Sequence, residues 1–500
     1  MNRHGKSDRP CGHGSCRRDG GDCSGQVGRL GRRAWALAAC AALAAGSLAS
    51  GSLAAATPAG GTAGTAASAG LLTSLEPELL SVAEPLDPAA PLVDRDAVAA
   101  LAAEHLSLER VGPVSVSVRD LTSEDEVFST NPAGALAPAS TLKILTATAA
   151  LSVLGPDTAL TTSAVLTRTG PTAGTVTLVA GGDVALAPDL GQPAEVMGHA
   201  GLGDLAWMAA VELRRRGVET VQVRLDDTVF SGPEVYPDWE WTLGTTWGAP
   251  TAPLAVMGGR AGGAFDATTF VADPALVAVE QFGRMLSRYG GDSTLALPSL
   301  AVTGSVARAA APVGAERVAF VDSSPIRELV AHMLRQSDNT MADALGRMTS
   351  VASGGPGSFA GCATAVKATL DDLGVPTVGL RMDDCSGLSH GSAVSAATLT
   401  SALVLAGGTD AGELGTVLRS LPVGALQGTL VHRFAETAAA GNLRAKTGTL
   451  TGVTSLAGMV QTTGGRELVF AVIANPDPKV LWTDSARQSI DRFAAALATL

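Results

Sequence analysis

The sequence predicts an α+β fold in which both ends of the chain contribute strands to one antiparallel sheet with helices packed on it. Two observations carry this expectation. The ordered part of the chain opens with a helix pattern and two strand patterns, and it closes with three strand patterns and a helix pattern. Between them, residues 161–317 change in character and are expected to form an inserted domain, which leaves residues 93–160 and 318–500 as one discontinuous main domain.

The opening elements follow from the spacing of apolar residues. Residues 94–108 repeat them at helical intervals. Valines at alternate positions over 114–118 predict a half-buried strand, and after a polar turn the chain returns in a second strand at Val127. Residues 141–153 are apolar nearly all round, which predicts a buried helix.

The later elements complete the expected main domain. Ser324 is expected as an N-cap with Pro325 at the first helical position, and another helix is expected from about Met341. Three strands and a last helix are predicted at 443–449, 454–461, 468–473 and 485–498. The insertion carries strand-like runs, one helix pattern and a tryptophan cluster, at 164–168, 175–179, 220–225, 205–215, Trp239, Trp241 and Trp247.

The first 92 residues indicate export. Residues 1–33 form a basic tail, residues 34–56 carry no charge, and residues 57–92 predict a flexible linker. A basic flank before an apolar run is typical of a signal peptide or a membrane anchor, and the length of the run leaves both open. We therefore expect an exported protein of the cell envelope that meets the membrane only through this segment.

Composition excludes several classes of protein. Of the 500 residues, 46% are hydrophobic and 16% are charged, which excludes a disordered chain. A polytopic membrane protein would need many long apolar runs. The net charge is −12, and the basic tail makes the rest more acidic still, which argues against nucleic acid as a partner.

Cysteine and histidine usage adds two expectations. Cys362 and Cys385 are the cysteines of the exported body, and they predict a disulfide in an oxidising compartment, with two buried free thiols as the alternative. The seven histidines are scattered, so neither a metal site nor a Ser-His-Asp triad is supported.

Three short motifs carry the chemistry. Singly, each has an ordinary structural meaning as a helix cap, a turn or a strand end. Together they match, in order and in setting, the set found in penicillin-binding proteins and class A β-lactamases. They are Ser140-x-x-Lys143 at the start of the buried helix, Ser337-x-Asn339 between two helices, and Lys446-Thr447-Gly448 on an expected strand.

The residue types suit acyl transfer. Ser140 and Lys143 are three residues apart and share a helix face. A serine hydroxyl needs a base to become a nucleophile, and a buried lysine near a second cation such as Lys446 can lose its proton near neutral pH. A lysine within an apolar run is more often functional than structural.

Further segments make the chain resemble the D-alanyl-D-alanine carboxypeptidase/endopeptidase family of low-molecular-mass penicillin-binding proteins, the serine peptidase family with an inserted domain. The interval between Ser140 and Ser337 is far longer than in a compact β-lactamase. Residues 178–183, 226–230 and 384–389 are similar to three family segments, with Cys385 in place of a glycine. The resemblance implies a β-lactamase/transpeptidase-like fold with a helical subdomain and a large insertion between the first and second motifs.

The resemblance also implies an activity: serine-type D-Ala-D-Ala carboxypeptidase, with endopeptidase activity left open, acting on peptidoglycan stem peptides, inhibited by β-lactams and needing no cofactor. Ser140 would be the nucleophile, Lys143 the general base and Ser337 the proton relay. Asn339 would hold Lys143 and the substrate backbone. The terminal carboxylate would bind Lys446, Thr447 and Gly448, and the backbone N–H groups of Ser140 and Thr449 would form the oxyanion hole.

Two alternative functions and one subsite remain open. A β-lactamase and a non-catalytic cell-wall-binding relative are the alternatives, disfavoured by the insertion and by the filled catalytic positions. Relatives that recognise a diaminopimelate side chain carry Arg directly after Gly-Leu-Ser, where this sequence has His390, and an acid in the tryptophan-rich stretch, where Glu240 is the candidate. The resemblance thus predicts weaker dependence on that side-chain carboxylate, unless His390 merely faces solvent.

Overall fold

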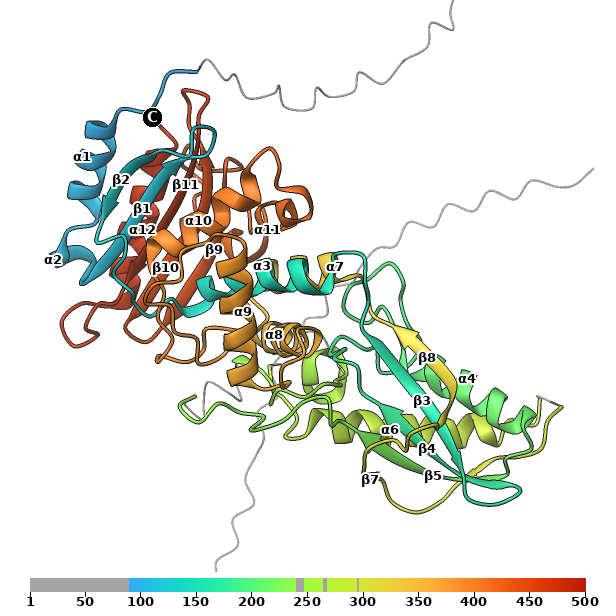
Figure 1. Cartoon of the computed structure of the whole chain (residues 1–500). Helices are drawn as coiled ribbons and strands as arrows, with labels where there is room; N and C mark the ends of the chain where they lie inside the picture. Colours follow the sequence, from blue (N-terminus) through green and yellow to red (C-terminus); the bar gives the residue numbers. More distant parts are fainter. Residues whose placement is uncertain (1–89, 240–246, 264–267, 295) are drawn as a thin grey trace, which may run out of the picture. The chain divides into compact units, whose positions relative to one another are not determined.

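The two ends of the chain meet in one antiparallel sheet of order β2-β1-β11-β10-β9 in the computed structural model, which describes residues 90–239, 247–263, 268–294 and 296–500 (Figure 1). Its strands are β1 (Val114–Asp120), β2 (Glu126–Thr130), β9 (Leu443–Leu450), β10 (Val453–Gln461) and β11 (Glu467–Ala474). The α+β class predicted from the sequence is confirmed. Strand β11 comes from the end of the chain and pairs with β1 from its beginning, Val118 opposite Phe470.

Helices cover both faces of this sheet. On one face, alternate β11 residues such as Phe470 pack with α1 (Arg95–His105) and α12 (Thr483–Leu497), next to the short α2 (Leu108–Val111). On the other face, the β11 residues Val469, Ala471 and Ile473 pack with the helical subdomain. Its elements are η1 (Ala139–Leu142), α3 (Lys143–Leu154), α7 (Ile326–Gln336), α8 (Asn339–Ala352), α9 (Phe359–Asp372), α10 (Ala396–Gly407), η4 (Gly412–Leu414), α11 (Gly415–Arg419) and η5 (Gly428–Leu430).

The structure corrects two sequence expectations in this domain. Strand β1 is not half-buried, because Ser117 between its valines is also buried and shares a 2.9 Å hydrogen bond with Thr400 of α10. Ser324 is not the N-cap of α7. Pro325 is the N-cap, with extended backbone at ψ 149°, and the helix begins only at Ile326.

A second sheet, of order β6-β5-β4-β3-β8 with β7 paired to β5, lies between the first and second motifs in sequence. Helices α4 (Leu202–Arg215) and α6 (Pro274–Gly290) share a hydrophobic core with it. Its strands are β3 (Thr161–Arg168), β4 (Ala173–Val179), β5 (Thr220–Asp226), β6 (Ala301–Val302), β7 (Ala307–Arg308) and β8 (Glu316–Asp322), with short turns η2 (Met257–Gly259) and η3 (Ala261–Gly263) nearby in sequence. Because β8 pairs with β3, this sheet extends beyond residue 317, where the insertion was expected to end.

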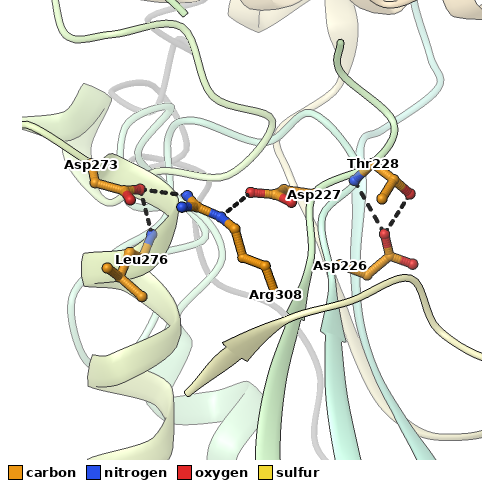
Figure 2. A network of polar contacts seen from close by, with 6 residues as sticks. All are labelled: Asp226, Asp227, Thr228, Asp273, Leu276 and Arg308. Carbon is orange, nitrogen blue, oxygen red and sulfur yellow. Dashed lines mark hydrogen bonds and ion pairs between the residues drawn. The ribbon is translucent and has the colours of Figure 1, made fainter. Parts of the chain in front are cut away.

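An arginine ties the inserted sheet to helix α6. Arg308 on β7 donates to Asp227, just after β5, and to Asp273, both at 2.7 Å (Figure 2). Asp273 is also the N-cap of α6 and accepts from the backbone N–H of Leu276 at 3.0 Å. The charge of Arg308 is thus matched by two carboxylates, and these hydrogen bonds raise its pKa further.

The segment that follows β5 joins the insertion to the helical subdomain. Phe230 forms a β-bridge to Gly357, and the next N–H, of Ser231, donates to the Gly357 carbonyl at 3.0 Å. The buried Arg347 guanidinium of α8 lies 5.3 Å from the Phe230 ring and 4.1 Å from the Phe359 ring. These cation–π contacts give the aromatic residue of the 226–230 segment a packing role.

Candidate active site

The turn that carries Ser140 is shaped by close backbone packing. Ser140 lies in the 3₁₀ turn η1, and the α-helix α3 begins only at Lys143, so the serine precedes the α-helix by one tighter turn. Ala139 has a positive φ of 48°. Two glycines pack closely against this turn. A Cβ atom on Gly387 would lie 2.0 Å from the carbonyl oxygen of Ala139, and a Cβ atom on Gly448 would lie 2.6 Å from the carbonyl oxygen of Pro138. The glycine of the Lys-Thr-Gly motif is therefore needed so that β9 can approach the serine.

Lys143 is fully buried and makes three hydrogen bonds. Its Nζ lies 2.9 Å from Ser140 Oγ and 2.6 Å from the Ser386 carbonyl oxygen, and it also contacts Asn339 Oδ1. Asn339 Nδ2 donates to the Trp247 carbonyl at 2.9 Å, which turns Oδ1 toward the lysine. A neutral amine has two N–H groups and one lone pair. The protonated amine donates to all three groups. Because Asn339 Oδ1 and the Ser386 carbonyl can only accept, they would take both N–H groups of the neutral amine and leave its lone pair for Ser140.

The protonation of Lys143 reflects opposing influences. Burial lowers its pKa, the charges of Asp343, Asp384 and Asp338 raise it, and the balance of the two is a pKa of about 8. Without these carboxylates, burial would hold the amine neutral across a wider pH range. The site thus has a lysine that changes charge close to neutral pH.

Ser337 and Lys446 form a second serine–lysine pair. Ser337 is the C-cap of α7 in the left-handed conformation, with φ 58°, and Asp338 is the N-cap of α8, so two residues turn the chain between two helices. Lys446 Nζ donates to Ser337 Oγ at 2.8 Å and to the Thr447 carbonyl at 2.9 Å. Burial lowers the Lys446 pKa well below its usual value, and the charges of Lys143 and Arg433 lower it further.

The remaining motif residues lie along β9. Thr447 is half-buried and its hydroxyl donates to Thr429 Oγ1 at 3.0 Å, Gly448 is buried, and Thr449 is exposed. The structure therefore brings Ser140, Lys143 and Asn339 into direct contact, and separately Ser337 with Lys446.

Asp343 is a site residue that the sequence analysis missed. It lies one turn after Asn339 on α8 and is buried, and its Oδ1 accepts from the Cys385 N–H at 2.8 Å. It thereby holds the backbone just before Ser386, whose carbonyl binds Lys143. Burial, together with the neighbouring charge of Asp384, raises the pKa of Asp343 to about 7. Its signal in the sequence was an acid four residues after Asn339, on the same helix face.

Asp384 organises the loop on the other side of Lys143. Its carboxylate accepts from the backbone N–H groups of Gly387 at 2.6 Å and Ser389 at 2.7 Å, and from Trp239 Nε1 at 2.7 Å. Burial raises its pKa. The sequence of the 384–389 segment predicted no role for Asp384, yet this acid links the tryptophan-rich stretch of the insertion to the loop that binds Lys143.

The same loop carries a disulfide. Cys385 is joined to Cys362 of α9, with the two Cα atoms 6.6 Å apart. Gly346 of α8 faces the sulfur atoms, since a Cβ there would lie 2.3 Å from Cys385 Sγ. A glycine at 346 therefore allows α8 to pack on the crosslink.

The proposed side-chain subsite is only partly described. His390 is exposed, and its Nε2 lies 3.1 Å from the Thr451 carbonyl in the turn between β9 and β10. Glu240 lies outside the described residues. Nearby in sequence, Asp238 accepts from the Ser389 hydroxyl at 2.6 Å, so an acid of this stretch lies beside the residue that precedes His390.

The chain is similar to one family of known proteins in both sequence and fold. A model of the D-Ala-D-Ala carboxypeptidase 3 (S13) family matches residues 96–291 and 254–497. Carboxypeptidase Rv3627c of Mycobacterium tuberculosis is 35% identical over 371 residues, 73% of this chain and 77% of that protein. Carboxypeptidase DacB of Mycolicibacterium smegmatis is 34% identical over 421 residues, 83% and 86% of the two chains. The crystal structure of penicillin binding protein 4 (dacB) from Haemophilus influenzae has the same fold, with a TM-score of 0.65 at 20% identity over 81% of this chain and 99% of that one.

The fold, the family match and the ordered motifs define a serine-type D-Ala-D-Ala carboxypeptidase of the penicillin-binding class. The chain belongs to the D-Ala-D-Ala carboxypeptidase 3 (S13) family, which confirms the resemblance seen in its sequence.

Proposed function

We propose that Ser140 is the nucleophile that cleaves the bond between two terminal D-alanines, with Lys143 as its general base. The observation that carries this assignment is the contact of the buried Lys143 Nζ with Ser140 Oγ at 2.9 Å, beside two acceptors, Asn339 Oδ1 and the Ser386 carbonyl. Once deprotonated, this amine has its lone pair available for the Ser140 proton. As the Ser140 oxygen bonds to the carbonyl carbon, its proton passes to Lys143. The backbone N–H groups of Ser140 and Thr449 receive the developing oxyanion.

The second pair completes the reaction. Ser337 relays a proton to the nitrogen of the leaving D-alanine as the C–N bond breaks, and it is reprotonated by the proton that Lys143 took from Ser140. This leaves an acyl-enzyme and a neutral Lys143. The Ser337 oxygen already accepts from Lys446, so its own proton is free to point elsewhere. Lys446 and Thr447, with the backbone of Gly448, bind the terminal carboxylate. Water then hydrolyses the ester. No metal or organic cofactor takes part.

The setting of this reaction is the cell envelope. The family acts on the cell wall, so the substrate we propose is the stem peptide of peptidoglycan and the place of action is extracytoplasmic. β-Lactams are the expected inhibitors: the Haemophilus influenzae protein has also been solved in complex with a β-lactam, and that structure matches this chain with a TM-score of 0.61. Within the described residues, no helix is both long and apolar enough to span a bilayer.

Fluorescent penicillin tests the assignment directly. The wild-type protein should become covalently labelled and should release D-alanine from a pentapeptide, and Ser140→Ala should do neither. Ser129→Ala is a matched control, because Ser129 lies on the edge strand β2, where its hydroxyl donates to Glu126 at 2.9 Å. Labelling of the Ser140→Ala protein at another serine would overturn the assignment.

We further propose that this enzyme prefers an unamidated diaminopimelate at the third position of the stem peptide less strongly than relatives that carry an arginine directly after Gly-Leu-Ser. A histidine bonded to Thr451 cannot make the paired contacts that an arginine makes with a carboxylate. The measurement is kcat/KM on stem peptides that differ only at the third residue. Lysine should be accepted about as well as diaminopimelate, and a strong preference for diaminopimelate would contradict this proposal.

A further inference from the structure

The insertion contains a pocket that includes none of the motif residues. Its volume is about 460 Å³, within the range of roughly 300–1,000 Å³ usual for small-ligand sites. One wall is a stripe of α6 in which Val277, Gln281, Arg284 and Arg288 follow at helical spacing. The full lining is Val256, Gly259, Arg260, Gly262, Gly263, Val271, Pro274, Val277, Gln281, Arg284, Met285 and Arg288.

The charge of this pocket is of one sign. Arg260, Arg284 and Arg288 line it, and no lining residue is acidic, although the whole chain has a net charge of −12. Arg284 and Arg288 are exposed and four residues apart, and neither forms an ion pair within the described part of the chain. Arg308 of the same domain is different, because two carboxylates hold it (Figure 2). The Arg288 guanidinium lies 5.9 Å from the Tyr289 ring, a contact that leaves its charge unneutralised. Two arginines that line one pocket without carboxylate partners favour an anionic ligand.

The rest of the lining restricts what that ligand can be. Val256, Val271, Pro274, Val277 and Met285 provide apolar surface between the arginines. Gly259, Gly262 and Gly263 have φ values of 76°, 73° and 65°, so the facing turn presents backbone without side chains. A ligand that suits both parts carries carboxylates on a backbone with small apolar side groups. A phosphodiester polymer would supply the charge but would leave the apolar wall unused.

We propose that this pocket binds the carboxylates of a second peptidoglycan stem peptide, apart from the one being cleaved. The inference rests on the proposed function, because its ligand is another part of the proposed substrate. Guanidinium groups bind carboxylates through paired hydrogen bonds, and alanine-rich peptides offer methyl groups to the apolar wall. The pocket would thus hold the enzyme on the polymer while Ser140 acts on a neighbouring stem.

The choice of residues for a test follows from their contacts. Arg260 Nη1 lies 3.9 Å from Asp338 Oδ2, and Asp338 is the N-cap of α8 between Ser337 and Asn339. Its replacement would disturb the active site as well. Arg284 and Arg288 have no such link, so Arg284→Ala/Arg288→Ala is the test variant. Arg95→Ala/Arg215→Ala removes the same charge from two exposed helix positions outside the pocket and serves as the control.

The experiment measures binding of a soluble disaccharide-tetrapeptide to penicillin-acylated protein by calorimetry, so that the active site is already filled. Wild type and control should bind equally, and the test variant should bind at least tenfold more weakly. The same peptide with its carboxylates amidated should bind no protein. Penicillin labelling of each sample measures the reactivity of Ser140 separately. A protein that is not labelled would therefore contradict the proposed function, and not the proposed binding of a stem peptide in the pocket.

Two results would overturn the proposal. One is equal affinity of the test variant and wild type for the tetrapeptide. The other is arginine-dependent binding of a glycerol-phosphate oligomer without binding of the tetrapeptide, which would assign the pocket to a phosphate polymer.

Discussion

The two buried lysines of the site have opposite surroundings. Lys143 has three carboxylates near it, from Asp343, Asp384 and Asp338, and its pKa falls only to about 8. Lys446 is equally buried, but its charged neighbours are the cations Lys143 and Arg433, which lower its pKa together with burial instead of opposing it. Each lysine contacts a serine hydroxyl, at 2.9 Å for Lys143 and 2.8 Å for Lys446.

This difference separates two tasks that need different lysines. A base must lose and regain a proton during turnover, and its pKa should lie close to the working pH. A carboxylate binder needs its charge only when the anion arrives. An incoming carboxylate would favour the protonated form of Lys446 and so restore the charge that binds it. Replacing each lysine, or a group that supports it, should therefore have distinct effects.

Removing the base should have the largest effect. Lys143→Ala should slow acylation by penicillin by about 10²–10⁴-fold, the usual cost of losing a general base. Lys143→Arg should be nearly as slow, because a guanidinium keeps the charge but cannot accept the proton. Stopped-flow acylation rates, with circular dichroism to confirm folding, measure both. A fast arginine variant would show that Lys143 supplies charge and not basicity.

Lys446→Ala should weaken recognition of the substrate carboxylate. A hydrogen bond to a charged group is worth about 1.5–3 kcal/mol, or roughly 10- to 100-fold. The readout is the ratio of kcat/KM for a peptide that ends in a free carboxylate to that for its amide. This ratio should be large in the wild type and roughly 10- to 100-fold smaller in the variant, in which Thr447 and the Gly448 backbone still contact the carboxylate. If the ratio stayed unchanged, Lys446 would not be the carboxylate binder.

Asp343→Asn should have a smaller effect on rate and a distinctive effect on pH dependence. The Asp343 carboxylate raises the pKa of Lys143, so its removal should move the acylation inflection to lower pH. Loosening of the Cys385–Ser386 backbone should reduce the rate about tenfold, as expected for a misplaced base. Asp371→Asn, at an exposed site on α9, is the control. An unmoved inflection would limit Asp343 to a packing role.

The disulfide should have the smallest effect. Mass spectrometry of non-reduced peptides should find Cys362 linked to Cys385, and reduction should cost roughly 3 kcal/mol of unfolding free energy for a loop of this length. Acylation should slow only slightly, because Asp343 and Asp384 also hold the loop. Two free thiols in the exported protein would contradict the pairing.

The sequence could predict the parts of the site that are local. Ser140 and Lys143 share one helical turn, and the Ser337 and Lys446 motifs each occupy a single short segment, so spacing alone identified them. The carboxylates around Lys143 could not be found in this way. Asp343 and Asp384 affect the pKa of Lys143 because they are buried beside it. Their burial arises only when α8 packs against a loop some forty residues later in the chain, where the Cys385 N–H donates to Asp343 Oδ1. The same limit explains the error on β1, whose second face is covered by α10 from far along the chain.

If Lys143 acts as a neutral base, its titration should control the pH dependence of acylation. The rate constant for acylation by a chromogenic β-lactam should rise about tenfold per pH unit below the inflection, as expected for a single essential base. It should level off above a pKa of about 8, the value set by burial and the three carboxylates. A rate that stays flat from pH 6 to pH 10, or that falls as Lys143 loses its proton, would contradict the account.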